Sequence, residues 1–278
     1  MLEWMGTINL TPDSFYEPSR FDSVSAMARI REFVEAGASI IDLGAVSTRP
    51  GASPVPLEEE WARLKPVLTA LRGTSVPGIT VEHRFRISID TTSSEIVRRA
   101  YDVVGPFIVN DISAGEDDPQ MLPLVAELGL TYVAMHKRGT PRTMDELTDY
   151  AGGIMRQLTN YFSVFSRLAE SAGVHDWILD PGLGFAKTEA QNWTILQRLK
   201  VLQSFGRPIL IGAADKRFTR DVPTRVLRWF GGKSAEAARE QCRVPGENAS
   251  GTDIAHTLAV ANGADILRVH TVPVLPSE

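Results

Sequence analysis

Eight short apolar segments of this 278-residue sequence each end in, or lie next to, a polar side chain that can do chemistry. The residues are Asn9, Asp42, Asp90, Asn110, Asp111, His136, Asp180, Lys216, Arg268 and His270. An isolated Asp at such a position is commonly a turn or helix cap. Eight of eight segments with an amide, acid, base or imidazole are harder to explain by capping, and this pattern indicates a shared site.

These side chains have the chemistry of a pocket for a flat heterocycle beside an anion. The carboxylates of Asp90 and Asp180, with the amide of Asn110, can recognise the amino and ring N–H donors of a planar heterocycle. Lys216 and Arg268 supply donors for a carbonyl oxygen or ring nitrogen, and an arginine can stack on the ring. Donors and positive charge for a phosphate or diphosphate are offered by Asn9, Thr48, Arg49, Arg268 and His270.

The same residues argue against a zinc site. Cys242 is the one cysteine of the chain, and His136 and His270 end separate segments. Magnesium fits better, because it keeps several waters and is bound mainly through substrate phosphates. We therefore expect Mg²⁺, shared between Asn9 and a diphosphate.

The apolar segments that position these groups have the character of buried strands. Runs such as SIIDLG and FIVNDI are apolar on both alternating faces, which is typical of a parallel sheet covered on both sides. The expected strands are residues 5–10, 39–44, 86–91, 107–112, 132–136, 177–181, 208–213 and 266–270. Helix-like stretches between them include residues 24–36, 57–71, 94–103 and 143–172.

Repetition of strand and helix eight times predicts a (β/α)₈ TIM barrel, in which the polar strand ends converge on one mouth. A doubly wound open sheet shows the same alternation, but no G-x-G-x-x-G follows the first strand. The irregular segments 11–23 and 47–56 follow the first two strands, where the catalytic loops of a barrel lie. We expect residues 1–278 to form a single domain.

Charge and hydropathy restrict the function further. The chain carries 34 acidic and 29 basic side chains, a net charge of −5, which argues against a nucleic-acid binder that works by bulk charge. No apolar run approaches the ~20 residues that a membrane span needs, and no basic segment followed by an apolar core begins the chain. We expect a cytoplasmic protein that binds neither nucleic acid nor membrane.

Seven strings in order along the chain resemble dihydropteroate synthase. They are GTINLTPDSF, STRPGA, SIDT, VNDISAG, MH followed by RGTPRTM, LDPGLGFAKT and RVH, and they extend from Met5 to His270. The resemblance implies a TIM-barrel transferase of folate biosynthesis that is the target of sulfonamides. Such an enzyme joins 6-hydroxymethyl-7,8-dihydropterin diphosphate to p-aminobenzoate, giving 7,8-dihydropteroate and diphosphate.

The resemblance also implies roles for particular residues. Asp90, Lys216 and Arg268 would be catalytic. The pterin would contact Asp90, Asn110, Met135, Asp180, Lys216 and Arg268. The diphosphate would contact Asn9, Thr48, Arg268 and His270, with Mg²⁺ near Asn9. Loop residues Asp13 and Phe15, with Arg49 and Pro50, would close over the reacting centre. The p-aminobenzoate site would be bordered by Pro50, Phe185, Lys216 and Arg217.

Three departures from the family pattern stand in this sequence. The usual Ser-Arg-Lys after the seventh strand is Ala214, Asp215 and Lys216, so a hydroxyl is lost and a positive charge becomes negative. The usual Gly-Gly-Glu-Ser after the second strand is residues 44–47, GAVS, so an acidic group is missing. Eight residues follow His270, fewer than the ~10 of a typical terminal helix. We therefore expect the eighth helix to be shortened or missing, or to be partly replaced by residues 217–248.

These departures leave two alternatives to a working synthase. One is a non-catalytic paralogue that keeps the fold as a binding protein, which Asp215 and the short C-terminus favour. The other is a pterin-binding methyltransferase that acts on a reduced folate with a corrinoid partner protein; the STRPG and RVH strings, suited to diphosphate, argue against it. The family's homodimer contact uses helices near the C-terminus, so the short C-terminus weakens the expectation of a homodimer.

Overall fold

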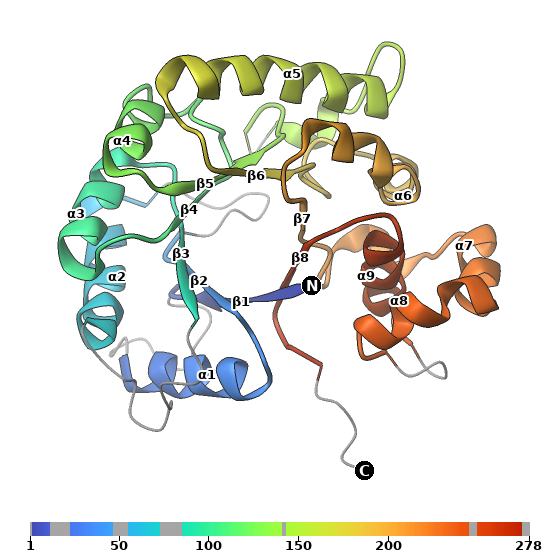
Figure 1. Ribbon diagram of the computed structural model, residues 1–278, viewed down its shortest axis with the longest axis horizontal. Helices are drawn as coiled ribbons and strands as arrows, with labels where there is room; N and C mark the ends of the chain where they lie inside the picture. The colour runs from blue at the N-terminus through green and yellow to red at the C-terminus, as the bar shows by residue number, and fades with distance from the viewer. Residues whose placement is uncertain are drawn as a thin grey trace.

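The computed structural model describes residues 2–11, 23–46, 55–72, 85–140, 143–244 and 249–273. Its centre is one sheet of eight parallel strands in the order β6-β5-β4-β3-β2-β1-β8-β7. The strands are β1 Glu3–Asn9, β2 Ile40–Gly44, β3 Arg86–Asp90, β4 Ile108–Asp111, β5 Thr131–Met135, β6 Trp177–Asp180, β7 Leu210–Ile211 and β8 Ile266–Val269. A parallel bridge between Leu179 and Ile209 joins β6 to the segment that leads into β7, so the sheet closes into a ring (Figure 1). The predicted barrel is confirmed, and the open doubly wound sheet is excluded.

The strands form where both faces of an apolar run can be buried. All five residues of β2 and all four of β4 and β6 are buried. Seven strands each send one apolar side chain into a central cluster of Met5, Ile40, Ile108, Val133, Ile178, Leu210 and Ile266. Packed layers of this kind make a barrel interior a core rather than a pore, so ligands must bind at its end.

Helices lie around the outside of the ring, and the two that precede the last helix stand farther out and pack against that last helix (Figure 1). They are α1 Ser23–Glu35, α2 Leu57–Leu71, α3 Ser94–Val104, α4 Met121–Leu128, α5 Ile154–Ala172, α6 Glu189–Gln197, α7 Thr224–Phe230, α8 Glu236–Gln241 and α9 Gly251–Ala261. Local signals fix several of their starts. Thr188 caps α6 and Ser250 caps α9 in reciprocal capping boxes with Gln191 and Asp253, which satisfies backbone donors that the first turn leaves unpaired. No helix of the described chain is long and apolar enough to cross a membrane.

The helix predicted for residues 143–172 is too long at its beginning. Helix α5 starts only at Ile154, and the segment before it holds a single 3₁₀ turn at Met144–Glu146. The reason is the pair Gly152 and Gly153, whose φ angles of 78° and 86° lie in the left-handed region that a right-handed helix cannot contain. The expected strand at residues 208–213 likewise shrinks to the two residues of β7.

The segment from Arg217 is more regular than its Gly and Pro content suggested. It contains a 3₁₀ turn at Arg217–Arg220, helix α7, a second 3₁₀ turn at Lys233–Ala235 and helix α8, all before α9 and β8. The described residues after β8, 270–273, contain no helix. Just past α8, Nη1 of Arg243 donates to the carbonyl oxygens of Ala36 (2.8 Å) and Pro273 (3.0 Å). Arg243 therefore links this segment to the end of α1 and to the chain after β8.

Candidate active site

The carboxyl ends of the strands surround a cavity of about 810 Å³. Seven of the residues predicted for the site line it, namely Asn9, Asp90, Phe185, Lys216, Arg217, Arg268 and His270. Residues far apart in sequence thus meet because parallel strands all end at the same rim of a barrel. Asn110, Met135 and Asp180 are buried, with exposed fractions of 4%, 3% and 8%, and do not belong to the described lining.

One side of the cavity is a network of carboxylates around Arg268, on β8. Its Nε donates to Oδ2 of Asp42 (2.7 Å), and its Nη2 donates to Oδ2 of Asp90 (2.9 Å). Asp42 also accepts from Ser88 Oγ (2.6 Å) and from Asn110 Nδ2 at 3.3 and 3.2 Å. The network joins β2, β3, β4 and β8, and it holds the Arg268 guanidinium through two of its nitrogen atoms, Nε and Nη2.

The charges of this network act on one another. Burial raises the pKa of Asp90 to about 7, an increase that Arg268 opposes and Asp42 adds to. Burial alone would lower the pKa of Arg268, but Asp42 and Asp90 raise it overall, so the guanidinium is charged throughout the neutral range. Arg268 therefore keeps a permanent positive charge at the base of the cavity.

The other side of the cavity presents Lys216, in the segment after β7. Its Nζ donates to the carbonyl oxygen of Leu183 and lies 4.9 Å from the centre of the Phe185 ring, a cation–π distance. Burial lowers the pKa of Lys216 to about 8, and Asp180 limits the decrease. Burial likewise raises the pKa of Asp180, while Lys216 lowers it. Lys216 and Asp180 thus act on each other electrostatically, whereas Asp90 and Arg268 are joined by a direct hydrogen bond.

The loop between β6 and α6, residues 181–188, holds Leu183 and Phe185 in place through its backbone. Gly182 N donates to Oδ1 of Asp180 (2.7 Å), and Gly184 N donates to Oδ1 of Asn192 (2.8 Å). A Cβ on Gly182 would lie 2.1 Å from the carbonyl oxygen of His136, so no larger residue fits there. The loop thus folds tightly against the end of β5.

Lys187, which we did not predict as a site residue, is 5% exposed and lines the cavity. Its Nζ donates to the carbonyl oxygens of Phe185 (2.8 Å) and His136 (3.3 Å) and lies 3.0 Å from Nδ1 of His136. Burial lowers the pKa of Lys187 to about 7, although Asp180 raises it. Burial, with the nearby Lys187, lowers the pKa of His136 to about 2, so this imidazole is neutral and its Nδ1 can accept from the lysine.

This chain resembles one family throughout its length. The family model described as "Pterin binding enzyme" matches residues 5–270. Dihydropteroate synthase of Synechocystis is 40% identical over 271 residues, covering 96% of this chain and 84% of that protein. The folic acid synthesis protein fol1 of Pneumocystis carinii is 39% identical over 274 residues, which cover 96% of this chain but 34% of that longer protein.

A solved structure gives the same answer for the fold. Dihydropteroate synthase of Xanthomonas albilineans with 4-aminobenzoic acid superposes with a TM-score of 0.76 at 31% identity, covering 98% of this chain and 88% of that one. The chain belongs to the dihydropteroate synthase family of pterin-binding enzymes. The predicted family is thereby confirmed, and the remaining site residues can be compared with the family pattern.

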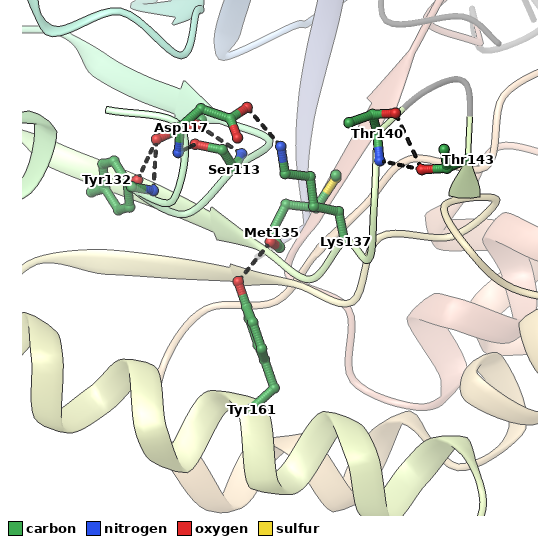
Figure 2. A network of polar contacts seen from close by, with 10 residues as sticks. Ser113, Asp117, Tyr132, Met135, Lys137, Thr140, Thr143 and Tyr161 are labelled. Carbon is green, nitrogen blue, oxygen red and sulfur yellow. Dashed lines mark hydrogen bonds and ion pairs between the residues drawn. The ribbon is translucent and has the colours of Figure 1, made fainter. Parts of the chain in front are cut away.

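Met135, which the family pattern assigns to the pterin pocket, ends β5 beneath the tight β6–α6 loop. Its carbonyl oxygen accepts from the hydroxyl of Tyr161 on α5 (3.2 Å), and Figure 2 shows this ring rising from the helix to the strand. In the same view, Lys137 reaches back to Asp117, with 2.6 Å between Nζ and Oδ2. A Cβ on Gly182 would be 3.2 Å from Met135 Cγ, so the Met135 side chain packs directly under the loop.

Two departures from the dihydropteroate synthase pattern lie at the rim of the cavity, and the first is Asp215, two residues before Arg217. Asp215 is exposed, has a φ of 54°, and donates from its backbone N to Oγ1 of Thr252 (3.3 Å). Arg217 has a side chain that is 69% exposed, with Nη2 3.7 Å from Oδ1 of Asp145 on the facing loop. A reversed charge at an exposed position changes energies little, so we expect the replacement of the usual arginine by Asp215 to have a small effect.

The second departure, GAVS at residues 44–47, begins at a close approach. A Cβ on Gly44 would lie 3.7 Å from Oδ2 of Asp90 and 3.9 Å from Oδ1 of Asn9. Gly44 therefore lies close to both Oδ1 of Asn9, on β1, and Oδ2 of Asp90, on β3, and a side chain at this position would contact both. Ala45 is fully buried and accepts at its carbonyl oxygen from Nη1 of Arg63 (2.6 Å), while Val46 lines the cavity.

Several predicted residues fall in parts of the chain that the structure does not describe. They are Asp13, Phe15, Thr48, Arg49 and Pro50. Sequence reasoning also noted Asp42 as a polar strand residue without assigning it to the site. Its signal was an acid in the middle of the apolar run IIDLG, where both strand faces are buried. Lys187 carried a weaker signal, a lysine directly after the Gly-rich GLGFA.

Proposed function

We propose that this chain joins 6-hydroxymethyl-7,8-dihydropterin diphosphate to p-aminobenzoate, releasing diphosphate and forming 7,8-dihydropteroate. One observation carries the proposal: a single cavity gathers Asp90, Lys216 and Arg268 with Asn9 and His270. The first three can recognise a pterin, while Asn9 and His270 supply donors for its diphosphate. The Xanthomonas relative with 4-aminobenzoic acid supports the identity of the second substrate.

In this proposal the pterin ring lies between Asp90 and Arg268 on one side and Asp180 and Lys216 on the other. Asp90 and Asp180 accept hydrogen bonds from its amino and ring N–H groups, and Asn110 and Lys216 complete the polar edge. Arg268 stacks on the ring, and Met135 contributes apolar surface. Asp90 and Asp180 are both nearly buried, which strengthens their hydrogen bonds to a ligand that displaces water.

The leaving diphosphate is assigned to Asn9, Thr48, Arg268 and His270. We place Mg²⁺ at Asn9, and the donor set fits that ion in one respect. The described residues offer no group of three or more His, Cys, Asp or Glu side chains for a metal, so most ligands would be water and phosphate oxygens, as Mg²⁺ accepts. When bound, the ion would neutralise phosphate charge; Asn9 would orient it through Oδ1.

The residues accelerate the reaction by alignment and electrostatics. As the bond to the diphosphate breaks, Arg268 and His270 meet the growing negative charge, and Asp90 and Asp180 face the ring whose methylene becomes cationic. The aniline nitrogen is already a nucleophile, so no strong base is needed. His136 is consistent with the absence of a strong base. Its pKa is lowered to about 2, so it is a weak base, and its Nδ1 lies 3.0 Å from Nζ of Lys187.

The p-aminobenzoate subsite is assigned to the outer part of the cavity. Phe185 and Lys216 form its inner wall, and Arg217 lies at the rim where a carboxylate would enter. Pro50 would border the same subsite, and Asp13, Phe15 and Arg49 would close over the reacting centre. We also propose that residues 1–278 act as one domain, because the described helices all surround one closed sheet.

An assay of diphosphate release tests the proposal. With both substrates and Mg²⁺, we expect continuous turnover, and with p-aminobenzoate omitted we expect none. Tight binding of the pterin diphosphate in calorimetry without any turnover would instead favour the non-catalytic paralogue. Failure to bind the pterin diphosphate, together with binding of a reduced folate, would favour the methyltransferase.

A further inference from the structure

Asp42 is a carboxylate with no exposed surface in the middle of an apolar strand. A buried charge of this kind is costly unless hydrogen bonds and an opposite charge compensate it. Asp42 has both: it accepts from Ser88 Oγ (2.6 Å), Asn110 Nδ2 (3.2 Å to Oδ2) and Arg268 Nε (2.7 Å). Two of these three donors, Asn110 and Arg268, are residues that the proposed function gives to the substrate.

The contact between Asp42 and Arg268 compensates charge and also fixes the orientation of the guanidinium. A guanidinium is a rigid planar fork, so fixing two of its nitrogens fixes its plane. Asp42 holds Nε, and Asp90 holds Nη2 at 2.9 Å. Asp90 must also accept hydrogen bonds from the pterin in the proposed function, so it cannot serve Arg268 alone. Asp42 lies deeper, and its hold on Arg268 does not compete with a ligand.

We propose that Asp42 is a positioning residue, which orients Arg268 and Asn110 before substrate arrives. It contacts no substrate itself and acts through the direction of the Arg268 guanidinium. The consequence is specific: the pterin and diphosphate side of the reaction depends on Asp42. The p-aminobenzoate side, built on Phe185 and Lys216, does not, because the described hydrogen bonds of Asp42 go to Ser88, Asn110 and Arg268. The inference rests on the proposed role of Arg268.

A matched control separates this role from a general contribution to stability. Glu60, on α2, is another buried carboxylate, 6% exposed, that accepts from Thr91 Oγ1 (2.6 Å). Among the residues that the structure describes, it makes no hydrogen bond to a residue of the proposed site, and it acts on Asp90 only through space. Asp42→Asn and Glu60→Gln each keep the shape of the side chain and remove one buried negative charge, so they differ in whether Arg268 loses its partner.

The experiment compares both variants with the unmodified chain. We expect Asp42→Asn to lower kcat about 30-fold and to weaken binding of inorganic diphosphate, measured by calorimetry, about 10-fold, which is less than outright loss of an aligned charged donor because the Arg268 guanidinium remains but is no longer oriented. The KM for p-aminobenzoate should stay within about 2-fold, because Lys216 and Phe185 keep their contacts. Glu60→Gln should leave kcat and diphosphate affinity within about 2-fold, even where it lowers Tm as much.

Three results would overturn the inference. One is an Asp42→Asn variant whose kinetics match Glu60→Gln; another is a parallel loss of all affinities together with Tm. If Asp42→Asn fails to fold, Ser88→Ala replaces it, because it removes the hydrogen bond that orients the Asp42 carboxylate toward Arg268. We then expect kcat and diphosphate affinity to fall by a smaller factor with the KM for p-aminobenzoate unchanged, and unchanged kcat in Ser88→Ala would be the third. Absence of turnover in the unmodified chain would instead refute the proposed function, while diphosphate affinity would still report on Asp42.

Discussion

The two sides of the cavity hold their cations by different means. On the β2–β3–β8 side, Arg268 is held by two carboxylates, Asp42 and Asp90. On the β5–β6–β7 side, Lys216 and Lys187 are held mainly by neutral groups: the carbonyl oxygens of Leu183, Phe185 and His136, and an imidazole nitrogen. Both arrangements satisfy buried donors, but carboxylates also stabilise the positive charge, whereas carbonyl dipoles do so only weakly.

The pKa values follow from this difference. The acids raise the pKa of Arg268 despite its burial, while burial lowers the pKa of Lys216 to about 8 and of Lys187 to about 7. One side thus offers a permanent charge, which suits a leaving diphosphate. The other offers ammonium groups that titrate close to neutrality and lie beside Phe185. The proposed division between a diphosphate side and a p-aminobenzoate side matches this electrostatic division.

The largest effect is expected from Lys216→Met. This change removes the ammonium that the proposed function uses on the pterin while keeping most of the side chain's volume. We expect kcat to fall at least 100-fold, the cost of losing one aligned charged donor. Diphosphate release reports the rate, with Lys200→Met, at an exposed position in the segment before β7, as control. Turnover within 3-fold of the unmodified enzyme would remove Lys216 from the site.

Arg268→Lys should have the next largest effect. A lysine keeps the charge, but its single ammonium cannot reproduce a planar fork bound to both Asp42 and Asp90. We expect kcat/KM for the pterin diphosphate to fall about 30-fold, with the affinities for pterin and for inorganic diphosphate falling together. Calorimetry with each ligand separates the two. Loss of only one affinity would contradict the double role of Arg268.

Much of this architecture could be predicted from sequence, because strands buried on both faces produce unbroken apolar runs. The same logic placed Asp90, Lys216 and Arg268 at one rim, since parallel strands end together. Boundaries were less predictable: α5 begins 11 residues after the expected Thr143, at Ile154, because glycines at 152 and 153 adopt positive φ. Nothing periodic in the run before α5 signals that stop.

The residues that support the site were harder to find than those that line it. Asp42 bonds to Arg268 across 226 positions in the chain, and Lys187 bonds to His136 across 51. No local pattern encodes such pairs, because only the closed sheet brings β2 near β8, with β1 between them, and the β6–α6 loop near the end of β5. Sequence therefore indicated the groups with polar character, and the fold defined which of them hold the others.

The pH dependence of kcat/KM tests the electrostatic division, with an effect of about tenfold per pH unit on each limb. Below a pH of about 7, Asp90 becomes protonated and loses its charge toward Arg268 and the pterin, so the rate should fall as pH decreases. Above about 8, Lys216 loses its charge, so the rate should fall as pH increases. We expect a bell with its maximum between these values.

Lys216→Arg sharpens this measurement. An arginine stays protonated across the range, so the alkaline limb assigned to Lys216 should disappear from the residual activity while the acid limb remains. Lys187 titrates in a similar range, and an alkaline limb that persists in Lys216→Arg would transfer it to that residue. A flat profile between pH 6 and 9 in the unmodified enzyme would contradict both assignments.

The smallest effect is expected from Lys187→Met. This variant tests whether the hydrogen bonds from Lys187 to backbone carbonyl oxygens hold the β5–β6–β7 side of the cavity in place. The change leaves the carbonyl oxygens of Phe185 and His136 without this donor, so the β6–α6 loop should loosen around Phe185. We expect the KM for p-aminobenzoate to rise about 5-fold with kcat nearly unchanged and the affinity for inorganic diphosphate unaffected. The two readouts are the KM ratio and calorimetry.

Tyr150→Phe is the matched control, because its hydroxyl donates to Ala186 O in the same loop (2.8 Å), whereas Lys187 donates to Phe185 O. It should lower the free energy of unfolding by about 1 kcal/mol, as loss of one buried hydrogen bond does, with little change in KM. If both variants raise the KM equally, the loop responds to any loss of stability and Lys187 has no particular role. If Lys187→Met weakens diphosphate binding as well, the two sides of the cavity are coupled. The Arg268 side and the Lys216–Lys187 side would then differ in how their cations are held but would not bind different substrates independently.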